Sequence, residues 1–319
     1  MRKISPLVLA AFAAFLLLIA QAPGEEPRDF NGTWVMKIGS QILFIVTLTP
    51  GSDGVQGELE RPAKLTMSGS RIWNIGSSIR TDRIVSSHFA NGILHLTTQN
   101  PNDLSDKADF AMSIRGNQAT LAFENLPLGV SVDPFPLEKA TKEAKIATDW
   151  NPERSYFIGD SDIPNPEMKA IFDEDQRVRA SGKIDWNKVN LSDAERRQQT
   201  RKLLAESALH TGKDFEEASF VFQHGNGPQD FLLAHSLAMV AISKGDDDAI
   251  WIAAATLDRY LQGIGQKQIF GTQYRLQSKD NWTQEPYDRE LISDALRKQL
   301  VVPSQSEQTK QLEEYQNQK

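Results

Sequence analysis

The feature that most constrains the fold is a change of hydrophobic pattern about halfway along the chain. Residues 30–126 carry short runs rich in β-branched and aromatic residues, separated by turn sequences such as Asn91-Gly92. After residue 166 these give way to longer segments with the spacing of helices. Strands and helices bury their side chains with different periods, so the two halves are expected to form separate cores. The sequence therefore predicts an α+β protein with a C-terminal all-α helical domain.

The first half is expected to form a small antiparallel β-barrel or sandwich. Strands are predicted over residues 42–48, 55–59, 71–75, 83–89, 93–98, 110–115 and 119–123. Asn91-Gly92 indicates a two-residue hairpin loop, because a type I′ turn needs positive φ at both central positions. Seven or eight short strands at this spacing are typical of a barrel or sandwich over residues 30–126.

Near the start of this half, Gly32-Thr33-Trp34 resembles the Gly-x-Trp opening of lipocalin-like barrels. In that fold the tryptophan closes the base of the barrel, and an arginine from a late strand lies across it. The resemblance implies this role for Arg115, and an interior that takes a small apolar ligand. The alternative is an ordinary core tryptophan in a barrel filled by side chains.

Residues 127–165 lose both periodicities and contain prolines 127, 134, 136, 152 and 164. We interpret this segment as a linker that holds the domain boundary, with one short helix over 138–147.

The helical domain is expected over residues 166–315. Helices are predicted over 167–180, 192–209, 215–224, 230–244, 249–262 and 288–300, followed by a polar tail. Ser192 with Glu195 three residues later has the spacing of a capping box, and therefore predicts the start of the second helix.

Residues 1–22 have the organisation of a cleavable secretory signal peptide. Arg2 and Lys3 precede an apolar run of 14 residues, whereas a membrane-spanning helix needs about 20. Ala20-Gln21-Ala22 is a small-x-small cleavage pattern, with a cut after Gly24 as the alternative; an uncleaved membrane anchor is the competing interpretation. The prediction is a soluble, periplasmic or secreted protein with no membrane insertion after cleavage.

The composition narrows the function further. The chain has no cysteine, which excludes disulfides, thiol nucleophiles, thiolate metal sites and lipid attachment to an N-terminal cysteine. Loss of Arg2 and Lys3 with the signal would change the formal charge from −7 to −9. An acidic surface does not suit nucleic acid or an anionic membrane, so neither is expected as a partner.

Several polar residues lie where the predicted helices end or turn, and side chains in such places can converge on a pocket. The candidates are Asp175, Gln176, Gln223, His224, Asp258, Arg259, Gln268, Thr272 and Gln273.

Each candidate has a structural alternative. Asp258 would act as a general base, or it would bond loop amides or pair with Arg259. Arg259 would hold an anionic group with two hydrogen bonds. His224 would be a general acid or base partnered by Asp258 or Asp175, or a helix C-terminal residue favoured by the dipole.

A cofactor is not expected, and neither is a metal. His224, His235 and one aspartate have no compact ligand spacing for zinc, and His235 fits a core position. For Gly271-Thr272-Gln273 the alternative to a site is a tight turn in which Gln273 bonds the backbone.

Taken as a set, these motifs resemble the bacterial family catalogued as domain of unknown function 6624, over residues 166–315. The matching segments are Asp175-Gln176 with Arg177 or Arg179, Gln223-His224, Asp258-Arg259, Gly265 to Gln273, and Asn281 to Pro286. Phe270 stands where the family pattern has tyrosine. The resemblance implies a helical fold and these candidate residues, but no reaction.

Three functions follow as hypotheses. The first is an exported protein that binds a small polar or cell-envelope ligand in the helical domain. The second is a hydrolase in which His224 and Asp258 act as acid and base while Arg259 holds charge. The third is a scaffold of tetratricopeptide-like helix pairs, although no period of about 34 residues is visible. Because no nucleophile motif is present, ligand binding is favoured over hydrolysis.

Overall fold

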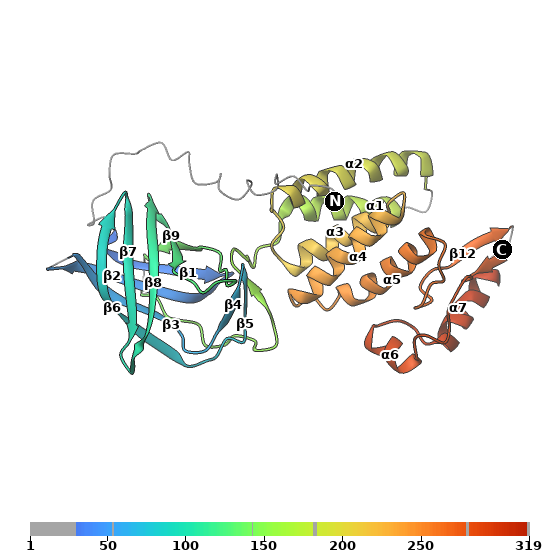
Figure 1. Cartoon of the computed structure of the whole chain (residues 1–319). Coiled ribbons are helices and arrows are strands. Elements are labelled where there is room, and N and C mark those ends of the chain that lie inside the picture. Colours follow the sequence, from blue (N-terminus) through green and yellow to red (C-terminus); the bar gives the residue numbers. More distant parts are fainter. Residues whose placement is uncertain (1–29, 53, 142, 181–183, 279–280, 318–319) are drawn as a thin grey trace, which may run out of the picture. The chain divides into compact units, whose positions relative to one another are not determined.

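The computed structural model describes residues 30–52, 54–141, 143–180, 184–278 and 281–317, so the predicted signal peptide lies outside the described residues. The chain divides into two compact units. The first comprises the described residues up to Met36, with 42–62 and 79–146, and the second comprises 37–41, 63–78 and the described residues from 147 onward. A β-barrel followed by a helical region confirms the predicted α+β class (Figure 1).

The β-barrel is closed and antiparallel, in the order β1-β10-β9-β8-β7-β6-β3-β2. Its strands are β1 (Gly32–Ile38), β2 (Gln41–Gly51), β3 (Gly54–Pro62), β6 (Ile79–Ala90), β7 (Ile93–Asn100), β8 (Asp103–Arg115), β9 (Gln118–Glu124) and β10 (Phe135–Lys139). The predicted hairpin loop between β6 and β7 is confirmed, with φ of 53° at Asn91 and 80° at Gly92.

The barrel extends beyond the predicted boundary at residue 126. Strand β10 pairs with β9 and with β1 and so closes the sheet, although it lies in the segment predicted as a linker. No strand was predicted here because of Pro134 and Pro136, since proline is usually excluded from strands that are paired on both sides. None of the described residues in 138–147 is helical, so the short helix predicted there is wrong.

Trp34 is a fully buried residue of the barrel core. Its indole Nε1 donates to the Phe30 carbonyl oxygen at 2.8 Å, and the Lys139 Nζ lies 5.2 Å from the ring centroid. The cation over Trp34 is thus Lys139, whereas Arg115, predicted for this role, is exposed. Lys139 comes from β10, the strand that the sequence pattern did not reveal.

Aromatic rings pack together in the rest of the barrel core. The ring of Phe135 lies 4.9 Å from Phe44 and 5.7 Å from Phe123, both edge to face. Such packing fits an eight-stranded barrel whose interior is filled by side chains.

Residues 63–78 leave the barrel between two of its strands. Strand β3 pairs directly with β6, with Pro62 opposite Ile79, and the chain between them belongs to the second unit. There β5 (Arg71–Trp73) pairs with β4 (Thr66–Ser68) and with β11 (Tyr156–Phe157). The strand predicted at 71–75 therefore exists, but in a separate sheet.

The second unit contains the helices. They are α1 (Pro166–Ala180), α2 (Trp186–Ala205), α3 (Gly212–Gln223), α4 (Pro228–Ser243), α5 (Ala249–Gly263), α6 (Asp294–Gln299) and α7 (Gln305–Asn317). Helices α1, α2, α3 and α4 share an apolar core that includes Met168, Leu203, Phe222 and Leu237. No helix in the described ranges combines the length and apolar character needed to cross a membrane.

Three helix starts differ from the predictions by three residues or more. Helix α6 begins at Asp294, after the cap residue Ser293, and not at residue 288. Helix α2 begins at Trp186, because the Asp185 side chain accepts from the Lys188 amide. Ser192 lies inside this helix, where its hydroxyl donates to the Lys188 carbonyl at 3.1 Å, so the predicted capping box is not a cap. Helix α3 begins at Gly212 with a capping box between Thr211 and Asp214. Several residue pairs fit the capping pattern, and packing decides which are used.

The second unit is not all-α. Strands β12 (Arg275–Ser278) and β13 (Asn281–Thr283) form a hairpin, and helix α7 occupies the predicted polar tail. Ser304 and Glu307 form a capping box at its start: the Glu307 carboxylate accepts from the Ser304 amide at 2.7 Å, and the Ser304 hydroxyl accepts from the Glu307 amide at 3.4 Å. This Ser-x-x-Glu signal was present in the sequence.

Candidate functional site

The structure joins the predicted polar residues through one continuous set of contacts in the second unit. The C-terminal end of α3 connects the two halves of this set of contacts. The Gln223 carbonyl oxygen accepts from Arg259 Nη1 of α5 at 2.8 Å, and His224 Nδ1 lies 3.1 Å from Asp175 Oδ2 of α1. Residues from three helices, distant in sequence, therefore lie in contact here.

The first half of the site surrounds Asp175, which is 1 % exposed. Its carboxylate accepts from Arg179 Nη1 at 2.8 Å and from Gln176 Nε2 at 2.9 Å. Arg179 also donates to Asp193 Oδ2 of α2 at 2.7 Å, and Asp193 pairs in turn with Arg196. Asp175 is thus a buried carboxylate held by cations and an amide, an arrangement that keeps a buried charge paired.

His224 is the C-cap of α3 and is partly buried. Its carbonyl oxygen accepts from Arg197 Nη1 at 2.7 Å, while its ring faces Asp175. Of the two partners considered for this imidazole, the structure supplies Asp175. The expected acid–base pair of His224 with Asp258 does not form, because both oxygens of Asp258 bind the loop after α5.

Asp258 is fully buried and holds the loop that follows α5. Its Oδ1 accepts from the amides of Ile269 at 2.8 Å and Phe270 at 3.0 Å. Its Oδ2 accepts from the Thr272 amide at 3.0 Å and the Thr272 hydroxyl at 2.8 Å. With four donors on two oxygens, the geometry favours the loop-bonding alternative for this residue over a general base.

Two glutamines of the same loop orient Arg259. The Gln268 side chain exchanges two hydrogen bonds of 2.9 Å with the Gln273 backbone. The Gln273 side chain donates to the Ala255 carbonyl at 3.1 Å and accepts from Arg259 Nε at 2.8 Å. Gln273 thus binds the guanidinium as well as the backbone.

The loop is supported from behind by residues that sequence reasoning missed. Gly271 has φ of 80°, and a side chain there would collide with Tyr287 and Gln308. Gln308 Nε2 donates to the Phe270 carbonyl at 2.8 Å, and Arg297 Nη2 donates to the Tyr287 hydroxyl at 2.8 Å. These polar residues show no local pattern, so only the tertiary contacts reveal their role.

Arg259 differs from the other arginines of the site. Within the described residues, no carboxylate lies in ion-pair range of its guanidinium, and its two hydrogen bonds go to the neutral oxygens of Gln223 and Gln273. Burial lowers its pKa from the usual value, and the positive charge of Arg179 lowers the pKa further. Arg259 is therefore a partly buried cation that has no counter-charge among the described residues.

The wider contact network also carries a positive surplus. Its charged members are Arg179, Arg196, Arg197, Arg201 and Arg259, against Asp175, Asp193, Asp230 and Asp258. Five positive and four negative charges leave +1, with histidine neutral, in a chain whose formal charge is −7. An anion is the ligand that this local field favours.

The remaining histidine candidate lies apart from this network. His235 Nδ1 is 2.9 Å from the Ala253 carbonyl oxygen, within the pair of helices α4 and α5. In the described part of the chain, no three histidine, aspartate or glutamate side chains gather closely enough to hold a metal ion.

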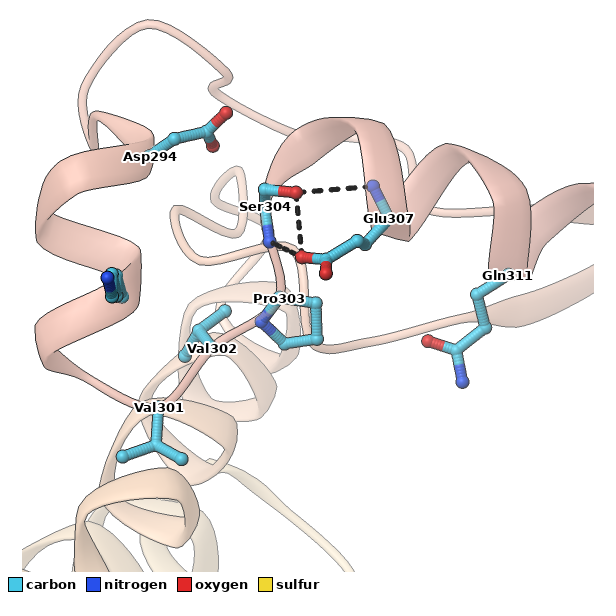
Figure 2. A pocket seen from close by; sticks show the side chains of 8 residues that line it. Asp294, Val301, Val302, Pro303, Ser304, Glu307 and Gln311 are labelled. Atoms are coloured by element: carbon cyan, nitrogen blue, oxygen red, sulfur yellow. Dashed lines mark hydrogen bonds between the residues drawn. The ribbon is translucent and has the colours of Figure 1, made fainter.

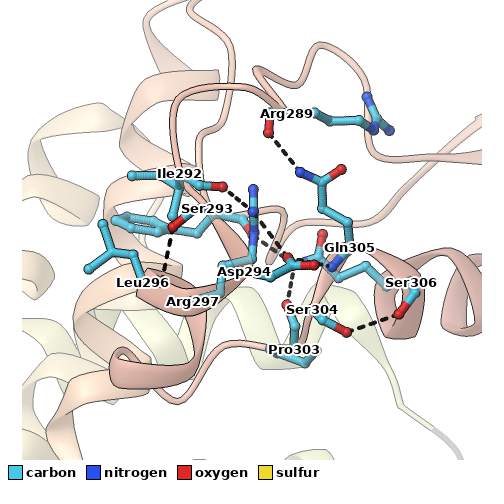
Figure 3. Close-up of polar contacts among 12 residues, drawn as sticks. Arg289, Ile292, Ser293, Asp294, Leu296, Arg297, Pro303, Ser304, Gln305 and Ser306 are labelled. Carbon is cyan, nitrogen blue, oxygen red and sulfur yellow. Dashed lines mark hydrogen bonds and ion pairs between the residues drawn. The ribbon is translucent and has the colours of Figure 1, made fainter.

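A pocket of about 630 Å³ lies between α6 and α7 (Figure 2). Val301, Val302 and Pro303 supply its apolar wall, and Asp294 and Glu307 supply carboxylates. Figure 3 shows how the polar groups are used: Asp294 Oδ1 accepts from the Gln305 amide at 3.0 Å and also pairs with Arg297. Since Glu307 caps α7, both carboxylates serve the junction of these helices. None of the predicted site residues lines this pocket.

No protein-family model, curated protein or solved structure matches this chain. The site is therefore interpreted from its own geometry and charge.

Proposed function

We propose that this chain is an exported protein, periplasmic or secreted, that binds a small polar ligand through an anionic group at Arg259. The observation that carries the proposal is the absence of a carboxylate beside this guanidinium within the described residues. Every other arginine of the contact network has an aspartate in ion-pair range.

The energetics support a ligand rather than a purely structural role. A partly buried charge with no carboxylate beside it loses hydration that no ion pair replaces. Two of the five N–H donors of Arg259 are used within the described residues, and these bonds orient the guanidinium. The remaining donors suit a carboxylate or phosphate-type oxygen pair, which an arginine binds with two parallel hydrogen bonds.

The test is binding of simple anions by the whole protein. We expect phosphate, sulfate or citrate to raise the thermal unfolding temperature, and Arg259→Gln to weaken binding at least about tenfold, since a hydrogen bond to a charged group contributes roughly 1.5–3 kcal/mol. Isothermal titration calorimetry of each anion measures the affinity directly.

Arg177→Gln is the matched control, because Arg177 lies on helix α1 of the same unit but forms an exposed ion pair with Glu174. It should bind anions like the unmodified protein. Equal affinity in the Arg259 and Arg177 variants would contradict the proposal. So would the absence of binding by a folded unmodified protein.

Hydrolysis is the second candidate, favoured by the contact between His224 and Asp175. A histidine oriented by a carboxylate is the arrangement of a general base, with the other ring nitrogen presented to the substrate. Arg259 would then hold the anionic part of an ester while His224 activates water. Turnover of anionic nitrophenyl esters that His224→Gln abolishes, with binding retained, would support this candidate over binding alone.

A further inference from the structure

We propose that Gln273 decides whether Arg259 binds an external anion, because its side chain holds the guanidinium with a neutral oxygen where a carboxylate would form an internal ion pair. Gln273 is thus a positioning and specificity-determining residue of the anion site, an inference that rests on the proposed function. It concerns the selectivity of the site and not the identity of the anion.

The guanidinium of Arg259 is held by two uncharged oxygens. Its Nε donates to Gln273 Oε1 at 2.8 Å, and its Nη1 donates to the Gln223 carbonyl oxygen at 2.8 Å. These bonds fix the direction of the guanidinium without neutralising its charge. Because Nε is used by Gln273, the edge formed by Nη1 and Nη2 is the one that suits the two oxygens of an anion.

The orientation of the Gln273 amide follows from its other partners. Its Nε2 lies 3.1 Å from the Ala255 carbonyl oxygen, which can only accept a hydrogen bond, and 3.0 Å from the Thr272 hydroxyl. That hydroxyl donates its single hydrogen to Asp258 Oδ2 at 2.8 Å, so it can only accept from Gln273. The amide oxygen is therefore the atom that faces Arg259.

Asp258 acts on Arg259 through two intermediate side chains. Its carboxylate accepts from three backbone amides and from the Thr272 hydroxyl, and it accepts no hydrogen bond from Arg259 in the described structure. A chain of hydrogen bonds then runs from Asp258 through Thr272 and Gln273 to the guanidinium. The carboxylate thus orients the amide, while the amide keeps a neutral oxygen against Arg259.

The substitution Gln273→Glu would turn this arrangement into an internal ion pair. A carboxylate oxygen would take the place of Oε1, which lies 2.8 Å from Arg259 Nε, the same distance as in the pair of Arg179 with Asp175. The local charge would fall by one, and the guanidinium would be less attractive to an external anion. The neutral amide is therefore what distinguishes Arg259 from the paired arginines of the same network.

The test changes the charge at residue 273 in the whole protein. We expect Gln273→Glu to weaken the binding of phosphate, sulfate and citrate at least about tenfold, as Arg259→Gln does, measured by isothermal titration calorimetry. Gln266→Glu is the matched control, since it adds the same charge at an exposed residue of the same loop. It should bind these anions as the unmodified protein does at about 0.15 M ionic strength, where exposed charges more than about 8 Å apart are largely screened.

A second pair of variants tests the orientation of the amide, and decides the matter if Gln273→Glu does not fold. Thr272→Val removes the hydroxyl that fixes the Gln273 amide, so we expect weaker anion binding and faster exchange of the Arg259 Nε hydrogen, measured by NMR. Thr272→Ser returns the hydroxyl and should restore most of the affinity. A less stable Thr272→Val protein with unchanged affinity and exchange would contradict the inference, because the hydroxyl would then have a structural role alone.

The outcomes separate the two proposals. Equal anion affinity in folded Gln273→Glu and Gln266→Glu proteins would overturn the role of Gln273, while the anion site itself stands. If none of the three anions binds to the folded, unmodified protein, the proposed function is rejected.

Discussion

At the residue scale, Glu217 of α3 is a carboxyl group in an unfavourable place. It is 3 % exposed, and its Oε2 has no hydrogen-bond partner among the described residues. Burial raises its pKa to about 7, although the positive charges of Lys213 and Lys169 act in the opposite direction. Near neutral pH the folded protein therefore contains this group partly protonated.

This pKa predicts the direction of a pH effect. The folded state binds the Glu217 proton more tightly than the unfolded state, so stability is lost as pH rises from about 4.5 to about 7. Glu217→Gln should remove this loss and stabilise the protein at pH 8 by up to about 3 kcal/mol, with little effect at pH 4.5. Urea unfolding at both pH values measures the difference, and exposed Glu174→Gln is the control. A stabilisation that does not depend on pH would contradict this explanation.

At the element scale, helix α7 holds the loop that orients Arg259. Gln308 is 2 % exposed and lies 3.4 Å from the Gln284 amide, which itself donates to the Gly271 carbonyl at 2.7 Å. One side chain of α7 thus contacts a loop that was not expected to have any support from the C-terminal segment.

Gln308→Ala should therefore destabilise the loop, because it removes the donor that lies 2.8 Å from the Phe270 carbonyl and the acceptor that lies 2.9 Å from the Tyr287 hydroxyl. The other donors to that carbonyl, Tyr287 and Arg297, lie farther away at 3.2 and 3.5 Å. Each lost hydrogen bond contributes roughly 0.5–1.5 kcal/mol. We expect faster amide exchange at residues 268–273 and weaker anion binding, measured by hydrogen exchange and calorimetry. Glu313→Ala, at an exposed position of the same helix, should change neither. Equal loop exchange in both variants would mean that α7 is not needed to hold the loop.

At the scale of the whole molecule, the first prediction concerns processing. If residues 1–22 are a signal peptide, the mature protein begins at Pro23 and contains 297 residues, or it begins two residues later after a cut behind Gly24. Intact mass spectrometry of the protein recovered outside the cytoplasm measures the mature start. Replacing Ala22 with leucine should block cleavage, since the site needs a small residue. A chain recovered with Met1 in place would contradict export by this route.

The two units are not consecutive segments of the chain. The helical unit takes in residues 63–78 from between two barrel strands, and Ile72 of that segment pairs with Tyr156. The chain therefore enters the second unit more than once, and a single cut at residue 126 or 147 separates neither unit cleanly.

Local patterns determined much of the architecture in advance. Asn91-Gly92 indicated its hairpin because positive φ is a property of those two residues, and the change of period separated strands from helices. The polar residues at helix ends were predicted to converge because side chains there can reach several elements, and contacts in the structure join them. Such signals depend on neighbours in the sequence.

Tertiary structure alone decided how the barrel closes and which charged residues meet in the site. Strand β10, hidden by two prolines, belongs to the barrel because β1 and β9 leave a gap that only a further strand closes. Likewise, Asp175 rather than Asp258 meets His224, and Arg259 has no carboxylate in the described structure, because those pairings depend on which distant helices pack together. Spacing along a chain shows which residues can reach a common point, whereas the charge of that point depends on every element that surrounds it.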